Sequence, residues 1–212
     1  MEKEFNEQES LRLITNMIAD AKGRFQKNSG SNIILWGYCI AILALANFIL
    51  LQVLEGEGKA FAYCVWICTI PLFIVNYLNE GRKARKSNSK NYIEFIAGNV
   101  WLGFFISTMI FVASVFILSG VYRSNTSGLL FVVISPMIMS ITGLCLFING
   151  LIYRFKPFVY GSAIFWVSAL LSALVLTVWE MQHLQFLILS ICMVFGFILP
   201  GHILYRKSKE DV

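Results

Sequence analysis

Two pairs of residues have the spacing of metal ligands. Cys64 and Cys68 lie one helical turn apart, and Glu180 and His183 form a Glu-x-x-His pair. A protein metal site normally takes three or four ligands from the chain, and neither pair has a further ligand cluster beside it. We therefore predict no metal site, and we interpret the cysteines as small apolar residues.

Polar side chains inside long apolar stretches are the next candidates for chemistry. Asn76, Asn99 and Asn149 all fall toward the same predicted side of the membrane, where they are candidates for lining a polar cavity. The simpler interpretation is hydrogen bonding between neighbouring helices, which typically contributes about 0.6 kcal/mol and up to about 1–2 kcal/mol. The sequence leaves both interpretations open.

Catalytic motifs are missing from the sequence. It contains no HExxH, GxSxG, P-loop or glycine-rich phosphate-binding pattern. No Asp, Glu, Lys or Arg lies deep in an apolar stretch, although such residues usually mark proton relays and coupled transport. We therefore predict that the chain is not an enzyme and has no catalytic residues and no cofactor.

The composition requires lipid as the solvent for much of the chain. Of the 212 residues, 58% are hydrophobic and 14% are charged, whereas a soluble domain is about 45–50% apolar and about 25% charged. Six uncharged stretches reach the roughly 20 residues with which a helix crosses a bilayer. They lack the alternating polarity of barrel strands, and a helix pairs its own backbone groups where no water can. The predicted spans are residues 33–54, 60–79, 95–119, 129–153, 158–179 and 184–205.

The distribution of Lys and Arg predicts the orientation. With both termini in the cytoplasm, all of the 17 basic residues except Lys59 and Arg123 fall in cytoplasmic segments, as the positive-inside rule requires. The predicted fold is an all-α integral membrane protein with six transmembrane helices in three antiparallel hairpins. A basic cytoplasmic tail covers residues 206–212. The net charge of +5 needs no nucleic-acid partner, because the basic residues lie where the orientation rule places them.

Residues 1–30 are predicted to form a cytoplasmic amphipathic helix. Residues 28–31, Asn-Ser-Gly-Ser, are expected to break this helix before the first span. The helix either lies on the inner membrane surface or against the ends of the bundle, or it pairs with a protein partner or a second copy through a short coiled-coil seam. Four apolar residues of its predicted working face recur at helical spacing: Leu11, Ile14, Ile18 and Phe25.

Three prolines are candidate helix hinges. Pro71, Pro136 and Pro200 fall one in each even-numbered predicted span. Proline has no backbone N–H, so each frees the carbonyl four residues earlier and favours a kink. We expect the sixth span to bend most, because Gly196 precedes Pro200 by one turn.

Tryptophans recur at a regular interval. Trp36, Trp101 and Trp166 are 65 residues apart, and the three prolines recur at nearly the same interval. An internal threefold repeat would give this spacing. Interfacial tryptophans in any regular six-helix protein would give it too, so the pattern does not decide between the two.

The sequence also resembles a known family. Residues 11–51, with SGSNIILWGY at their centre, resemble the start of a family of small bacterial inner-membrane proteins with six spans, and the resemblance extends over the whole layout. The family has no assigned activity. The resemblance therefore implies the architecture and a bacterial inner membrane, and it implies nothing about mechanism.

Our leading hypothesis is a non-enzymatic module that senses, regulates or scaffolds through its cytoplasmic face. That face would comprise residues 11–25, the basic loop 82–90 and the tail. Its partners would be the lipid bilayer and a cytoplasmic or membrane protein, or a second copy of the chain. The competing hypothesis is a small-solute carrier or channel with a path along the proline-containing even-numbered spans.

Overall fold

The computed structural model describes residues 7–86, 92–121, 133–178 and 183–210, and every regular element in these ranges is helical. The segment η3 is a π-helix, and η1 and η2 are 3₁₀-helices. In chain order the elements are α1 (Glu7–Val53), η1 (Gly56–Gly58), α2 (Lys59–Ala62), η2 (Tyr63–Cys68), α3 (Thr69–Lys86), α4 (Tyr92–Val121), α6 (Ile134–Ile152), α7 (Lys156–Val178), α8 (Leu184–Met193), η3 (Val194–Ile198) and α9 (Leu199–Glu210).

Among the described residues, five helical segments are long and apolar enough to cross a membrane. These are Gly30–Val53, Phe95–Ser119, Ile134–Ile152, Lys156–Val175 and Leu184–Arg206. The last of them runs without interruption through α8, η3 and α9. The chain is therefore a multi-pass, all-α membrane protein, which confirms the prediction at that level.

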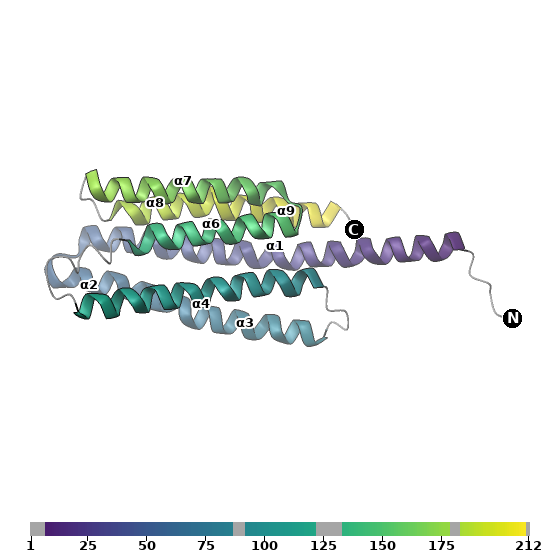
Figure 1. Cartoon of the computed structure of the whole chain (residues 1–212), viewed down its shortest axis with the longest axis horizontal. Helices are drawn as coiled ribbons and strands as arrows, with labels where there is room; N and C mark the ends of the chain where they lie inside the picture. The colour runs from purple at the N-terminus through teal and green to yellow at the C-terminus, as the bar shows by residue number, and fades with distance from the viewer. Residues whose placement is uncertain (1–6, 87–91, 122–132, 179–182, 211–212) are drawn as a thin grey trace.

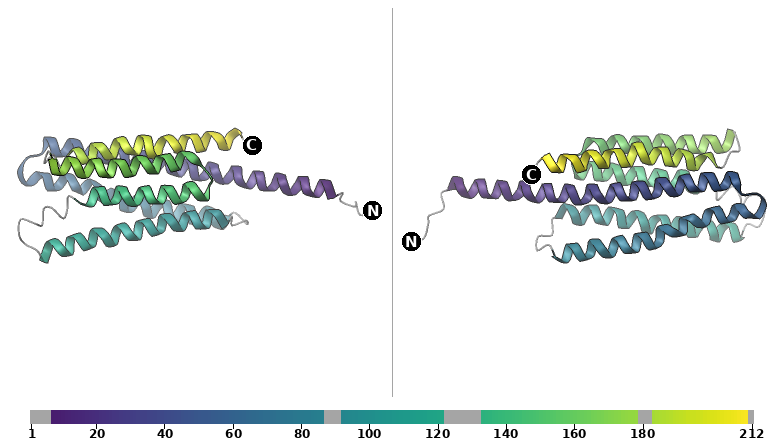
Figure 2. Two further views of the ribbon diagram at one scale, coloured as in Figure 1. Left: turned by 45° about the horizontal axis from the view of Figure 1, so that its top comes forward. Right: turned by 180° about the vertical axis from the view of Figure 1, so that it is seen from behind.

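The helices lie side by side along one long axis, and each rod runs antiparallel to the one before it (Figure 1). The first residues of α1 and the last residues of α9 lie at the same end of the bundle, which we call the terminal end. The connection from α1 to α2 and the start of α8 lie at the opposite end, which we call the far end. Both views in Figure 2 show the same arrangement.

The outside of the bundle is apolar. Leu170 and Val53 are each 70% exposed, and Ile110 is 62% exposed. Soluble proteins rarely leave large contiguous apolar patches in water, whereas hydrocarbon tails solvate such side chains without cost. The exposed leucines, isoleucines and valines therefore mark the lipid-facing surface.

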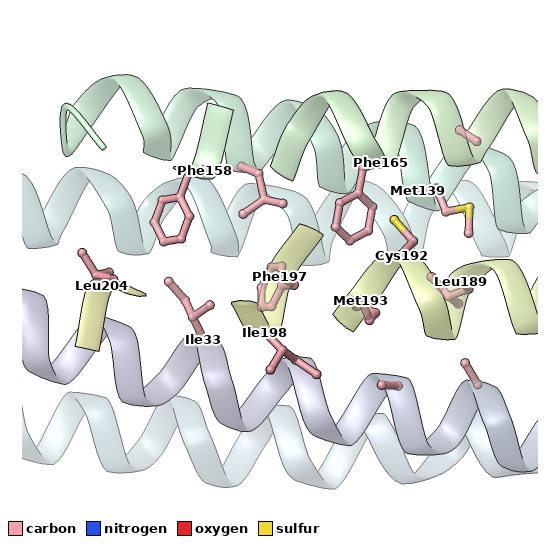
Figure 3. Close-up of a cluster of buried hydrophobic side chains, with 14 of the residues drawn as sticks. Ile33, Met139, Phe158, Phe165, Leu189, Cys192, Met193, Phe197, Ile198 and Leu204 are labelled. Atoms are coloured by element: carbon pink, nitrogen blue, oxygen red, sulfur yellow. The ribbon is translucent and has the colours of Figure 1, made fainter. Parts of the chain in front are cut away.

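The interior is built where α1, α6, α7 and the α8–α9 rod meet. Phe158 and Phe165 of α7 are fully buried, and Phe165 makes an edge-to-face contact with Phe197 of η3. Figure 3 shows these rings with Cys192 and Met139 in one shared interior. Aromatic and sulfur-containing side chains fill the space between the helices. Because lipid tails are as apolar as these side chains, van der Waals packing rather than the hydrophobic effect holds the helices together.

The helix α1 contributes a narrow stripe of small residues to this interior. Gly37 faces Ile198 and Phe197 so closely that a Cβ at position 37 would overlap the Ile198 side chain. Small residues let two helix backbones approach, as membrane helices commonly require. The buried stripe of α1 consists of Gly30, Ile33, Gly37, Ala41, Ala44 and Asn47.

The prediction of a break at residues 28–31 is wrong, because α1 is one helix from Glu7 to Val53. Gly30 is a packing residue: a Cβ there would lie 3.1 Å from the backbone nitrogen of Tyr205 in α9. A glycine inside a helix costs only about 1 kcal/mol. The long spanning helix overcomes that cost, since extending an existing helix needs no new nucleus.

The predicted span 60–79 is divided among α2, η2 and α3 rather than forming one long α-helix. Its apolar helical part covers Tyr63–Asn76. Pro71 is the third residue of α3, and it cannot donate a hydrogen bond to the carbonyl of Ile67 in the preceding 3₁₀ segment. The α-helical pattern begins again at Thr69, two residues before this proline.

The helices α6 and α7 pack tightly against each other along their length. A Cβ on Gly143 would overlap the Trp166 indole, and one on Gly150 would lie 2.9 Å from a methyl group of Val159. The Trp166 indole N–H donates to the Ser140 carbonyl at 3.3 Å. This pair is joined across a short turn at the terminal end, whereas the predicted hairpins join neighbouring spans at the far end.

Candidate functional site

Asn149 is the most deeply buried of the three predicted cavity asparagines. Its side chain on α6 is 1% exposed, and its Nδ2 donates to the Cys145 carbonyl one turn earlier at 2.8 Å. Its Oδ1 has no hydrogen-bond partner among the described residues. The amide N–H group is thus used within the asparagine's own helix, and one acceptor remains toward the interior.

The other two asparagines lie on different helices and differ in exposure. Asn76 is half-buried on α3, and Asn99 is exposed on α4. Gly103 and Ser107 follow Asn99 at one-turn intervals on the same exposed side of α4, and a Cβ on Gly103 would meet nothing within 4 Å. Asn99 therefore belongs to an outward polar and small-residue stripe, while Asn149 belongs to the interior.

Asn47 is a buried polar residue that the sequence reasoning did not single out. It is fully buried on α1, and its Nδ2 donates to the Ala62 carbonyl of α2 at 2.9 Å. The bond ties the far end of α1 to the start of the irregular segment that follows it. The signal was available in the sequence, because Asn47 follows Ala44 by three residues and so falls on the same helix face as Gly30, Gly37 and Ala44.

The rod α8–α9 carries further polar contacts to its neighbours. The Ser190 hydroxyl donates to the Ala41 carbonyl of α1 at 3.1 Å. Gln185 is 4% exposed and Ser172 of α7 is fully buried. Their Oε1 and Oγ atoms have no partner among the described residues. Each buried polar atom left unpaired costs about 1–3 kcal/mol, so these positions are costly ones, as are Asn149 and Asn47, whose Oδ1 atoms also have no partner among the described residues.

The backbone changes its hydrogen-bond pattern directly before Pro200. Residues Val194–Ile198 form a π-helical turn, and the Leu199 N–H donates to the Val194 carbonyl five residues back. Pro200 has no N–H with which to pair the Gly196 carbonyl. That oxygen projects toward α7, where a Cβ on Gly161 would overlap it. The glycine at 161 thus makes room for a carbonyl that the proline has freed.

The two other candidate hinges differ from Pro200. Pro136 is the third residue of α6, inside the first turn, where the backbone N–H has no partner within the helix anyway. Pro71 is exposed and lies in the first turn of α3. Among the three prolines, Pro200 alone lies next to a π-helical turn.

The turn between α6 and α7 holds a residue in a strained conformation. Arg154 has φ = +50°, a region where side chains other than glycine are disfavoured by about 1–2 kcal/mol. The Phe155 N–H donates to the Gly150 carbonyl at 2.9 Å, and the Arg154 N–H donates to the Leu151 carbonyl at 3.2 Å. This is the hydrogen-bond pattern of a helix end that usually has glycine at the Arg154 position. A basic residue therefore stands where the local backbone favours glycine.

The two sequence pairs with metal-ligand spacing do not form a larger cluster in the described part of the chain. Cys64 and Cys68 are exposed on η2. The His183 ring contacts Phe48 of α1 at a centroid distance of 5.9 Å. Glu180 lies outside the described residues. No group of three His, Cys, Asp or Glu side chains is close enough to hold a metal in the ranges described.

The first part of α1 extends beyond the rest of the bundle. Residues 7–29, which we call the arm, continue in line with the span Gly30–Val53 and project past the end of α9 (Figures 1 and 2). At 1.5 Å per residue the arm is roughly 35 Å long. The predicted face with Leu11, Ile14, Ile18 and Phe25 lies on this arm. The described backbone there is helical and does not fold back across the bundle.

Comparisons of the chain with protein-family models, with curated proteins and with solved structures found no match.

Proposed function

We propose that the chain crosses a bacterial inner membrane six times, with the terminal end in the cytoplasm. The distribution of charge supports this orientation. The turn residues Arg154 and Lys156 are exposed at the terminal end, and α3 ends there in the basic sequence RKARK. Lys59 lies at the far end. The positive-inside rule, by which Lys and Arg remain on the cytoplasmic side of the membrane, orients the bundle in this way.

Besides the five long helices, one more crossing, the second in chain order, is made by the segment of η2 and α3. Since α1 ends at the far end and α4 begins at the terminal end, this segment must travel the length of the bundle between them (Figure 1). Ring contacts support its place in the bundle. Phe73 of α3 stacks on Phe105 of α4 at 3.8 Å and contacts Trp36 of α1 at 6.2 Å. This path supports the predicted hairpins, in which neighbouring spans pair at the far end.

The molecular role is that of a non-enzymatic module for sensing, regulation or scaffolding, and the cytoplasmic face is its working surface. The observation that carries this proposal is the uninterrupted helix α1, because it fixes the arm rigidly to a membrane span. A change in how the spans pack would move the arm, and a ligand on the arm would bias the spans. A rigid element that joins two sites is what such coupling needs.

The described asparagines weigh against the competing carrier or channel. Asn99 is directed outward, and the Asn149 amide bonds within its own helix. One feature favours the carrier: the π-helical turn before Pro200, since backbone irregularities in helices are frequent at functional sites. The carrier therefore remains the second candidate, with its path beside η3.

A paired experiment separates the two roles. A photo-crosslinking residue at Ile18 in native membranes should capture a defined partner chain. The same residue at the lipid-facing position Ile42 should not. Removing residues 7–27 should abolish the cellular phenotype, and Asn149→Leu should leave it intact. Solute flux in liposomes that is lost in Asn149→Leu and unchanged by removal of the arm would overturn the regulatory role.

A further inference from the structure

Most of the arm projects beyond the other helices that the structure describes. In both figures no described helix runs beside it beyond the end of α9 (Figures 1 and 2). The spanning part of α1 fills the bilayer, whose apolar core is about 30 Å thick. The arm must therefore stand in water, where a lone helix with an apolar stripe in its sequence is unfavourable.

The sequence of the arm has the register of a two-stranded coiled coil. Taking Leu11 as position a, apolar residues fill every a and d position as far as Phe25. The opposite face, position f, has Asn16 and Gly23. The a and d positions are Leu11, Ile14, Ile18, Ala21 and Phe25.

We propose that the arm pairs with the arm of a second copy as a parallel, in-register coiled coil. The inference rests on the proposed function only in placing the arm on the cytoplasmic side. Because α1 is one continuous helix, the arm leaves the membrane at a fixed height and in a fixed direction. Two copies inserted with the same orientation therefore present their arms side by side, parallel and without offset.

The flanking charges fit this pairing. In a parallel pair, position g of one helix faces position e of the next heptad in the other. Met17 of one copy then faces Lys22 of the second, and Arg24 faces Ser29. No like charges oppose each other, and the Lys22 stem covers part of the apolar seam. The residues at positions e and g therefore allow a second copy to pair in parallel and without offset.

A short coiled-coil seam is sufficient because the membrane already holds the two copies in one plane and one orientation. Fewer than three heptads would pair only weakly as a free peptide. Confinement to one bilayer with a fixed orientation converts pairing into an event at high effective concentration. The symmetric contact uses the same face of both copies and closes at two chains.

Cysteine cross-linking of the full chain in native membranes tests the register. The five native cysteines are replaced by alanine, and single cysteines are introduced as Ile14→Cys, Ile18→Cys, Asn16→Cys and Gly23→Cys. Positions a and d of a parallel pair bring the two Cα atoms within disulfide reach, and position f does not. Mild oxidation should give covalent dimers on the order of tenfold faster at positions 14 and 18 than at 16 and 23.

A second variant keeps the proposal falsifiable. Ile18→Glu should suppress cross-linking at Leu11→Cys, whereas the matched Asn16→Glu should not. Equal cross-linking at all four positions, or none at any, overturns the self-pairing. Disulfide-linked capture of a different protein at position 18 without homodimer also overturns it, while leaving the proposed function standing. Homodimers whose arms are labelled only from the periplasmic side would instead overturn the proposed function.

Discussion

Gly161 of α7 and Gly196 of the π-helical turn meet backbone to backbone, and a Cβ at position 161 would overlap the Gly196 carbonyl oxygen. The contact joins two effects of the sequence. Pro200 removes the donor that would have paired this carbonyl within the helix, and Gly161 leaves the space that the carbonyl enters. A proline on one helix therefore requires a glycine on its neighbour.

Gly161→Ala should destabilise the bundle by about 1–3 kcal/mol, because the added methyl meets backbone that cannot rotate away. The matched control is Gly103→Ala on α4, where a Cβ meets nothing within 4 Å. The control should be neutral or slightly stabilising. Unfolding in detergent micelles, followed by circular dichroism, measures both. Equal losses in the two variants would show that the contact does not hold α7 against η3.

Asn47→Leu should cost about 0.6–2 kcal/mol, because it removes the hydrogen bond to the Ala62 carbonyl at the far end. Asn99→Leu, on the exposed side of α4, should change stability by less than about 0.5 kcal/mol. The same unfolding assay compares them. An Asn99 variant as unstable as the Asn47 variant would place Asn99 in a contact that the single chain does not make.

Arg154→Gly should stabilise the chain by about 0.5–1 kcal/mol, because glycine adopts φ = +50° without strain. Arg154→Ala is the control, since alanine retains the strain and should give no gain. The orientation in the membrane should not change in either variant, because the other basic residues of the terminal end remain. A loss of stability in Arg154→Gly would mean that the guanidinium makes contacts worth more than the strain it brings.

The spans could be predicted largely because charges are too costly in lipid to interrupt them. Five of the six predicted spans coincide with the apolar helices to within a few residues at most ends. Residues 129–132 and 179 of the predicted spans lie outside the described ranges. The stretch 60–79 differs, because composition alone does not predict the 3₁₀ segment η2 within it.

The wrong prediction of a break at residues 28–31 of α1 has a different cause. The pattern Asn-Ser-Gly-Ser predicts a break when local propensity decides, but Gly30 is needed to let Tyr205 approach. A one-sequence pattern cannot tell a glycine used for a turn from one used for packing. Asn47 differs: its place on the buried face can be read from the sequence, but its partner, the Ala62 carbonyl, is brought to it only by the fold.

Of the candidate site residues, Pro200 was the most informative. Its neighbour Gly196 marked the rod most prone to irregular backbone, and the π-helical turn lies there. The grouping of Asn76, Asn99 and Asn149 depended on their depth in the membrane alone. Depth does not fix the direction in which a side chain points, and Asn99 and Asn149 differ in that respect.

Locating the two ends of the chain relative to the membrane tests the central claim most directly. Reporters that are active only in the cytoplasm or only outside the membrane are fused before Glu7 and after Arg206, with a third insertion beside Lys59. Six crossings predict that both ends report the cytoplasm and that Lys59 reports the outside. An arm and a tail on opposite sides would mean that η2 and α3 do not cross, and would contradict the account.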